Sequence, residues 1–192
     1  MAAGLALVTS DAMDRPLLNS YWVIPGRLLA GEYPGDPDDS QARQRLQRLN
    51  AAGIDSFIDL TEEGELPPYR FLLPKHSHYL RSPIVDTRVP NNVAQTQELL
   101  DAIRAALASD RNVYVHCRAG IGRTGLVIGC YLADEESNGR AALKTLNRLW
   151  RQSERSAAWP AVPQTAEQAA YIRGWPGLAK RSLALASSGR VR

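Results

Sequence analysis

A cysteine and an arginine enclose a glycine-rich turn, and residues of these types at this spacing could carry out phosphoryl transfer. In the segment VYVHCRAGIGRTG (113–125), Cys117 follows an apolar run and Arg123 comes after five intervening residues. Three glycines allow a tight turn whose amide N–H groups converge, and a helix beginning directly behind the turn adds a positive dipole. Such a turn binds anions, and a guanidinium adds a bidentate fork for phosphate oxygens. The segment therefore combines a sulfur nucleophile with a cradle for a tetrahedral dianion.

Each of these features has an ordinary explanation when it is taken alone. A cysteine at the end of a strand is most often a small core residue, and glycine-rich turns are common between strands and helices. Here Cys117, Arg123 and the hydroxyl of Thr124 occur together, at fixed spacing, after a run typical of a buried strand. Converging N–H groups and a nearby cation also favour the thiolate form of a cysteine. The combination favours a catalytic role for this loop.

The chemistry needs a general acid as well, because an alkoxide or phenolate leaves poorly without a proton. Asp86, in the stretch SPIVDTRVP, follows an extended segment and lies between Pro83 and Pro90. An aspartate can simply cap a turn, which would give Asp86 no catalytic role. Asp59, which also ends a predicted strand, is the competing candidate for the acid.

The elements that position these groups follow from hydrophobic periodicity and turn residues. Strands are predicted as a pair within 21–33 around Pro25-Gly26, and at 54–60, 79–86 and 112–116. Helices are predicted from Asp38 to Gly53, from Pro90 to Leu107, at 126–136, at 140–155, and from Thr165 toward Trp175. Segment 61–77 is predicted as loop with room for one turn of helix. The alternation predicts an α/β fold with a central, mostly parallel sheet of four to five strands flanked by helices.

Length and composition set the outer limits on function. The chain has 192 residues, of which 44% are hydrophobic and 22% charged, which fits one globular domain. We expect that domain to cover 15–177, between a flexible N-terminus (1–14) and a flexible basic tail (178–192). The net charge of +3 argues against a nucleic-acid partner.

The cysteine count and the hydropathy pattern bear on the compartment. Two cysteines, Cys117 and Cys130, make no disulfide scaffold, so we expect a reducing, cytoplasmic setting. The first residues lack the basic leader of a secretory signal, and no apolar run approaches the ~20 residues of a membrane span. We therefore expect no integral membrane association.

The segment HCRAGIGRTG resembles the signature loop of cysteine-dependent protein tyrosine phosphatases, which has the form H-C-x5-R-[ST]. The resemblance implies that Cys117 attacks phosphorus to form a phosphocysteine and that Arg123 holds the phosphoryl oxygens. It implies that Thr124 helps the sulfur to leave, and that His116 orients the loop and tunes the thiolate. The N–H groups of the phosphate loop would complete the cradle, and they belong to Arg118, Ala119, Gly120, Ile121, Gly122 and Arg123.

Two further segments are similar to parts of the same superfamily. The Asp86 loop lacks the Trp-Pro-Asp of the larger tyrosine-specific enzymes and looks like the loop of dual-specificity and Cdc-type phosphatases. PQTAEQ (163–168) resembles the glutamine loop, which implies that Gln164 positions the hydrolytic water. Thr165 and Gln168 also fit a helix capping box that needs no catalytic role. The stretches WVIPGRLLAGEYP and FIDLTEEGE resemble compact bacterial and dual-specificity domains, and together these likenesses imply the phosphatase-like fold.

The expected function is a monomeric phosphomonoester hydrolase acting on phosphotyrosine, and also on phosphoserine and phosphothreonine if the cleft is shallow. Its partner would be a phosphorylated protein or a small phosphomonoester, with no metal and no cofactor, because loop amides and Arg123 supply the positive field. An inositol-phosphate or phosphoinositide phosphatase using the same loop is one alternative. A phosphate-binding pseudophosphatase is another, although Cys117, Arg123 and Asp86 together argue against it. A thiol-transfer enzyme such as a rhodanese would leave the acid loop without a purpose.

For several other sequence features, a functional interpretation stands beside a structural one. His76 and His78 are too few for a zinc site. Cys130 lies in an apolar helix, either as core or as a resolving thiol for Cys117. One face of the helix predicted at 140–155 is basic and could dock an acidic partner or simply be solvated; it carries Arg140, Lys144, Arg148, Arg151 and Arg155.

Overall fold

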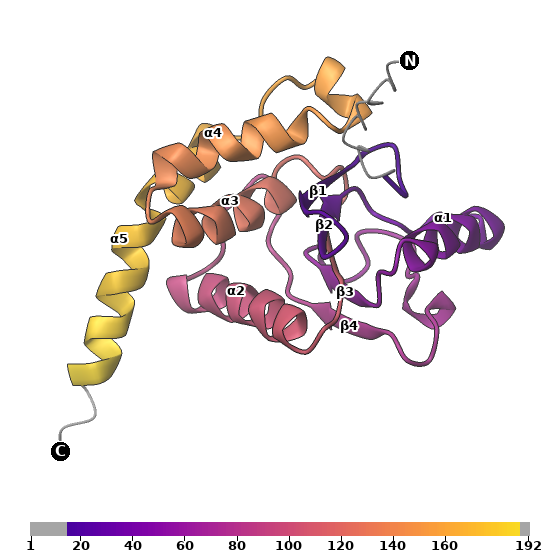
Figure 1. Ribbon diagram of the computed structural model, residues 1–192, viewed down its shortest axis with the longest axis horizontal. Helices are drawn as coiled ribbons and strands as arrows, with labels where there is room; N and C mark the ends of the chain where they lie inside the picture. The colour runs from indigo at the N-terminus through magenta and orange to yellow at the C-terminus, as the bar shows by residue number, and fades with distance from the viewer. Residues whose placement is uncertain (1–14, 189–192) are drawn as a thin grey trace, which may run out of the picture.

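A five-stranded sheet forms the centre of the fold, as the computed structural model shows for residues 15–188, with side chains described as far as Ala179 (Figure 1). The N-terminal segment expected to be flexible (1–14) lies outside the described residues. The strands are β1 (Ser20–Ile24), β2 (Leu28–Gly31), β3 (Ser56–Asp59), β4 (His78–Arg81) and β5 (Val113–His116). Their order is β1-β2-β5-β3-β4, and all pairs are parallel except β1 with β2. The predicted α/β fold with a mostly parallel sheet is confirmed.

The central strand β5 sets the position of the loop that follows it. All four of its residues are buried, as expected for a β-branched and aromatic strand with layers on both faces. His116 pairs with Gly31 of β2 on one side and with Asp59 of β3 on the other. Three parallel strands therefore end level with one another, and the segments that leave them meet at one edge of the sheet.

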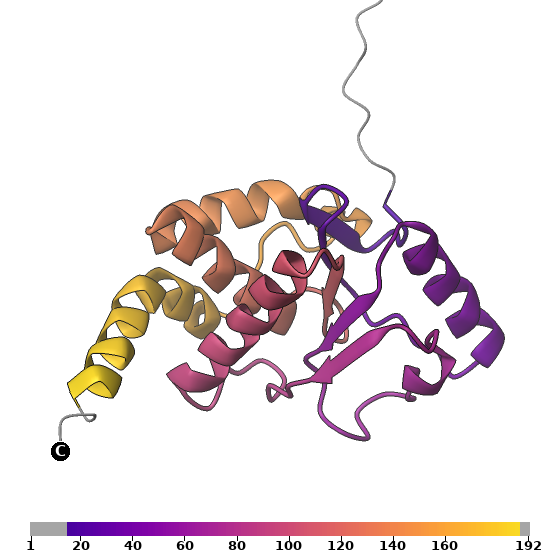
Figure 2. The ribbon, with the colours of Figure 1, turned by 60° about the horizontal axis from the view of Figure 1, so that its bottom comes forward.

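Helices cover the two faces of the sheet unequally. Helices α2 (Val93–Ala108), α3 (Arg123–Glu136), α4 (Gly139–Trp150) and α5 (Ala166–Ser188) lie on one side, and α1 (Asp39–Ala51) lies on the other (Figures 1 and 2). Successive strand residues alternate between two cores, as the twofold period of a strand requires. Val113 and Val115 enter the larger core under α2–α5, and Tyr114 enters the smaller core under α1.

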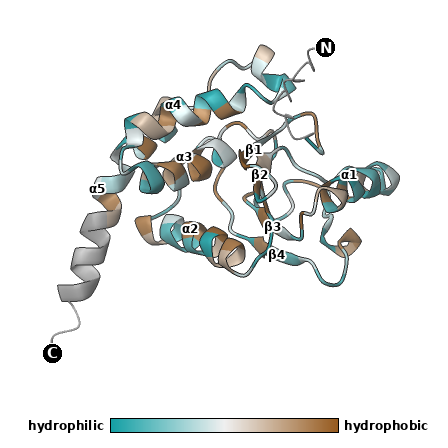
Figure 3. Ribbon diagram, in the orientation of Figure 1, coloured by the Kyte–Doolittle hydropathy of each residue, from teal (hydrophilic) through white to brown (hydrophobic). Residues whose placement is uncertain are grey.

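Polar caps begin helices α1 and α2 at the predicted places. Asp38 accepts a hydrogen bond from the Ser40 amide at α1, and Asn92 accepts one from Gln95 at α2. Helix α1 is largely hydrophilic in Figure 3, and its buried residues are Ala42, Leu46 and Leu49. None of the helices in the described range is both long and apolar enough to span a bilayer.

The largest differences from the predicted elements are at three ends. Strand β4 ends at Arg81 instead of 86, just before Pro83, which cannot donate to a ladder; the Asp86 segment therefore leaves the sheet as a loop. Helix α4 ends at Trp150 instead of 155, and a short turn η2 (Glu154–Ala157) follows. The side chain of Gln152, just past α4, hydrogen-bonds both backbone groups of Trp22 at 3.0 Å. Helix α5 continues to Ser188, so the tail predicted to be flexible from 178 is helical as far as that residue.

Candidate active site

The phosphate loop, residues 117–122, joins the end of β5 to the start of α3. Cys117 is 3% exposed, and Gly122 forms the N-cap of α3 without a side-chain hydrogen bond. Gly120 has φ +76°, and a Cβ there would lie 2.6 Å from the carbonyl carbon of Gly31. A larger residue would therefore be strained and would also collide with β2. Among the residues that the structure describes, no backbone acceptor faces the N–H groups of 118–122. These donors and the helix N-terminus can hold an anion.

Arg123 is buried, with 1% exposure, and two loops hold its guanidinium. Its two Nη atoms donate to the two carboxylate oxygens of Glu65, both at 2.7 Å. Nη1 also donates to the carbonyl of Ile84 at 3.2 Å, and Nη2 lies 3.2 Å from Oδ1 of Asp86. The Nε–H is buried and has no partner among the described residues. A buried donor of this kind suits an oxygen of a bound phosphate.

Glu65 is a site residue that the sequence did not reveal. It lies in the loop after β3 (residues 61–77), which contains three glutamates, and nothing in their spacing separates them. The hydrogen bonds from Arg123 lower the pKa of Glu65, against the opposing effect of partial burial. The ionised carboxylate and the guanidinium form a bidentate pair, which fixes the plane of the guanidinium.

The two aspartates considered for the general acid occupy different environments. The side chain of Asp86 is 54% exposed and lies on the loop after β4, beside Arg123. Asp59 is fully buried, and it accepts hydrogen bonds from the Thr61 amide at 2.9 Å, the Thr61 hydroxyl at 2.6 Å and the Tyr79 hydroxyl at 2.7 Å. Burial alone would raise the pKa of Asp59, but the hydrogen bonds from Thr61 and Tyr79 lower it overall. An ionised, immobile carboxylate cannot deliver a proton to a leaving group, so the geometry favours Asp86.

His116 lies directly beneath the phosphate loop and is fully buried. Its Nε2 is 2.6 Å from the hydroxyl of Tyr69, while its Nδ1 is 3.9 Å from Asp59, too far for a hydrogen bond. Burial is the main reason that the pKa of His116 falls to about 4, against the opposing charge of Asp59. The imidazole is therefore neutral near pH 7, and its contact with Asp59 is not an ion pair. Tyr69 supplies an orienting bond that the sequence had not indicated.

Two further predicted residues lie next to the loop. Thr124 is buried, and its hydroxyl donates to the Gly31 carbonyl over a long 3.4 Å. Gln164 is exposed, and a Cβ on Gly122 would lie 2.9 Å from its Oε1, so its amide faces the loop directly.

Gln168 fits the capping-box interpretation. It exchanges hydrogen bonds with Thr165 at 3.1 and 3.2 Å, and its Nε2 donates to the Arg88 carbonyl at 3.0 Å. The start of α5 thereby holds the far end of the Asp86 loop.

The structure also gives the surroundings of the other residues that the sequence singled out. Cys130 is fully buried in the larger core, and burial raises its pKa. Arg155 does not extend the basic face of α4; it binds the phosphate loop through the carbonyl of Ala119, which the sequence did not indicate. His78 lies 3.2 Å from Arg111, and no cluster of three metal-ligating side chains occurs in the described range.

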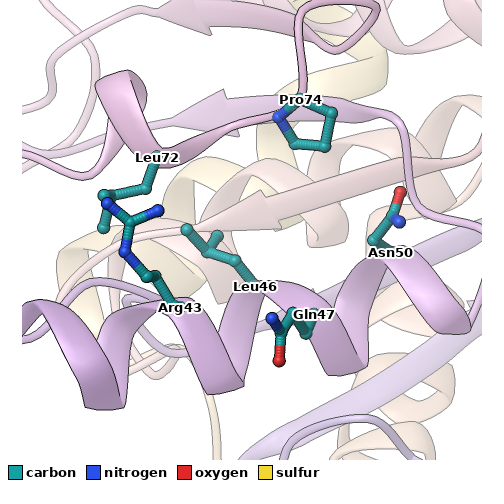
Figure 4. Close-up of a pocket in the computed structure, with 6 residues that line it drawn as sticks. All are labelled: Arg43, Leu46, Gln47, Asn50, Leu72 and Pro74. Atoms are coloured by element: carbon teal, nitrogen blue, oxygen red, sulfur yellow. The ribbon is translucent and has the colours of Figure 1, made fainter.

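A separate groove lies between α1 and η1 (Arg70–Leu72), on the side of the sheet opposite α3 (Figure 4). Its lining residues are Arg43, Leu46, Gln47, Asn50, Leu72 and Pro74. None of these side chains is a nucleophile or a carboxylate, and none belongs to the phosphate loop. We therefore place no chemistry in this groove.

Comparisons with known proteins agree with this geometry. A family model described as "Swiss Army Knife protein, DSP-PTPase phosphatase domain" matches residues 18–168. A protein of Invertebrate iridescent virus 3, named "Putative tyrosine phosphatase 067L", is 39% identical over 115 residues. The aligned region covers 57% of this chain and 44% of the viral protein, so the chain spans less than half the length of that relative.

Solved structures share the fold. The crystal structure of Tk-PTP in the active form gives a TM-score of 0.67 at 25% identity, covering 83% of this chain and 97% of that one. PTPMT1 in complex with PI(5)P gives a TM-score of 0.62 at 20% identity, covering 84% and 98%.

Proposed function

This chain belongs to the dual-specificity type of cysteine-dependent protein tyrosine phosphatase domains, and we propose that it hydrolyses phosphotyrosine through a phosphocysteine intermediate. The observation that carries the proposal is the buried Arg123, at the end of the loop that Cys117 begins, whose Nε–H has no partner within residues 15–188. The loop N–H groups and this guanidinium provide donors for the oxygens of a phosphoryl group that the sulfur can reach.

In the first step, the sulfur of Cys117 attacks phosphorus. The S–P bond forms while the bond from phosphorus to the leaving oxygen breaks, and Asp86 gives that oxygen its proton. Arg123 and the loop N–H groups hold the equatorial oxygens, where negative charge is spread in the transition state. Glu65 keeps the guanidinium in the plane that this contact requires.

In the second step, a water molecule attacks phosphorus and the S–P bond breaks. The sulfur leaves as a thiolate, inorganic phosphate is released, and the Asp86 carboxylate takes the proton of the water. Gln164, whose amide lies beside Gly122, would orient that water. The hydroxyl of Thr124, held only by a long bond to Gly31, can turn to stabilise the departing thiolate.

Phosphoinositide hydrolysis is the second candidate function, because one structural neighbour is PTPMT1 with bound PI(5)P. Arg118 is exposed within the phosphate loop and places a cation near the mouth of the site, where a further anionic group could bind. The phosphotyrosine proposal draws instead on the viral relative, whose printed name is that of a tyrosine phosphatase.

Phosphate release by the purified chain, measured in reductant, tests the proposal and ranks these substrates. One peptide would be compared in phosphotyrosyl, phosphoseryl and phosphothreonyl forms, with a soluble short-chain phosphoinositide as the fourth substrate. We expect kcat/KM to be highest for phosphotyrosine, and acid-quenched samples to carry a phosphoryl group on the Cys117 peptide by mass spectrometry. No hydrolysis of any substrate would reject the enzyme. A tenfold preference for the phosphoinositide would replace the first candidate with the second.

A further inference from the structure

Two consecutive carbonyl groups of the phosphate loop are held from outside the loop. The carbonyl of Arg118 accepts a hydrogen bond from the backbone N–H of Tyr33 at 3.1 Å. The carbonyl of Ala119 accepts one from Nη1 of Arg155 at 2.7 Å. In a planar trans peptide the C=O and the following N–H point in opposite directions. The N–H groups of Ala119 and Gly120 are therefore directed away from this outer wall.

Arg155 is itself held in place by a polar cluster. Its Nη2 lies 3.1 Å from Oε2 of Glu32, and its backbone N–H donates to the side-chain oxygen of Asn19 at 3.2 Å. The amide of Asn19 donates to Glu32 at 2.9 Å, and Arg45 pairs with the same carboxylate at 2.9 Å. Glu32 thus gathers three donors, and the Arg155 guanidinium bridges this anchor to the loop.

The opposite peptide orientation would be harmful to phosphate binding. If the peptide between Ala119 and Gly120 turned over, its carbonyl oxygen would replace the N–H that faces the cradle. A negative dipole would then face the phosphate oxygens. Gly120, which has no side chain and packs on Gly31, has a φ of +76° and enough conformational freedom to permit such a turn. The Tyr33 N–H secures the preceding peptide, so Arg155 is the side chain that secures this one.

We propose that Arg155 is a positioning residue for the phosphate loop, which fixes the Gly120 N–H toward the bound phosphoryl group by holding the Ala119 carbonyl outward. This role deepens the proposed function and rests on it. It also explains why a guanidinium is suited to the position. One Nη atom reaches the carbonyl while the other pairs with Glu32, and a lysine ammonium has no such fork.

The test compares Arg155→Met with Arg151→Met, in which an exposed arginine four residues earlier is changed in the same way. Binding of inorganic phosphate is measured by calorimetry, and turnover of p-nitrophenyl phosphate by absorbance. We expect Arg155→Met to weaken phosphate binding and to lower kcat/KM by roughly 10- to 100-fold, which is less than the roughly 10²- to 10³-fold cost of removing an oriented donor itself. Arg151→Met should stay within twofold of the wild type in both.

Two further measurements separate positioning from a loss of folding. Guanidinium ion at low millimolar concentration should restore part of the activity of Arg155→Met and should leave the wild type unchanged. Glu32→Gln, which keeps Arg155 but weakens its anchor, should shift both readouts in the same direction by less. Unchanged phosphate binding in Arg155→Met, or a loss without rescue that matches a lowered Tm, would overturn the inference. A wild type that binds phosphate but hydrolyses nothing would instead reject the proposed function, and the binding comparison would still test Arg155.

Discussion

Different kinds of chemical groups contact the phosphate loop and Arg123 on the two sides of the site. On the β2 side, backbone atoms of Gly31 and Tyr33 contact the loop directly, and the Arg155–Glu32 cluster braces it. On the β3–β4 side, Glu65 and Asp86 reach Arg123 from two loops outside the sheet. The first side is suited to hold one geometry. The second side brings two carboxylates to one guanidinium, and these carboxylates have to shift when a phosphate dianion binds. Catalysis needs both a fixed cradle and an acid that can move.

The largest effect should come from changing the nucleophile, Cys117, which begins the loop between these two sides. Cys117→Ser should lower turnover by at least about 10⁴-fold, because a serine hydroxyl in this loop has no base to activate it. Binding of inorganic phosphate should persist, since the N–H groups and Arg123 remain. Steady-state rates check the loss of turnover, and calorimetry on the same preparation checks phosphate binding. Turnover near that of the wild type would remove Cys117 from the mechanism.

The acid on the β3–β4 side, Asp86, should give the next largest effect. Asp86→Ala should lower kcat by about 10²- to 10³-fold for an alkyl phosphate and by much less for p-nitrophenyl phosphate, whose leaving group needs little help. The slope of log kcat against leaving-group pKa, measured over a series of aryl phosphates, reports this difference.

Asp59→Asn is the matched control for that experiment. Because Asp59 is buried and accepts several hydrogen bonds, we expect this change to lower the free energy of unfolding by about 2–4 kcal/mol without altering the leaving-group slope. A steeper slope in Asp59→Asn than in Asp86→Ala would exchange the roles of the two residues.

Glu65→Gln tests whether the carboxylate side orients Arg123 as well as neutralising it. The glutamine amide has one acceptor oxygen where the carboxylate has two, so it cannot accept both hydrogen bonds in the same way. The guanidinium of Arg123 is then held less firmly in its plane, although the size of the side chain beside it is unchanged. We expect kcat/KM to fall by roughly 10-fold, as a charged bidentate bond is worth about 1.5–3 kcal/mol. Glu63→Gln, an exposed neighbour in the same loop, is the control. Equal effects in both variants would mean that the pair with Arg123 has no part in catalysis.

The last of these effects is on stability in acid and not on activity. The pKa of His116 is about 4 in the folded chain and near 6.5 when the chain is unfolded, so the unfolded state binds the proton more readily. Stability from this residue is complete above pH 6.5 and falls by up to about 3 kcal/mol as the pH drops to 4. Urea unfolding across this range should therefore show a steeper loss in the wild type than in His116→Gln. Identical slopes would contradict a buried neutral imidazole.

The sequence was most informative where chemistry and backbone geometry coincide. The glycines, Cys117 and Arg123 lie within one short segment, so their spacing alone placed them on one loop. The parallel sheet followed from alternating periodicities. Glu65 and Arg155 could not be predicted, because each reaches the loop from a distant segment through a side chain whose direction depends on tertiary packing. Arg155 was even assigned to the wrong surface, since a regular helix to 155 would place it with Arg151 and Arg148.

The early end of α4 has one more consequence. Strand β1 is an edge of the sheet, and an edge strand presents free N–H and C=O groups that can recruit a strand from another chain. The carboxamide of Gln152 occupies both backbone groups of Trp22 at the middle of that strand. It acts as a one-residue substitute for a neighbouring strand. In the phosphatase domain these two backbone groups are therefore already paired and cannot bind a strand from another chain.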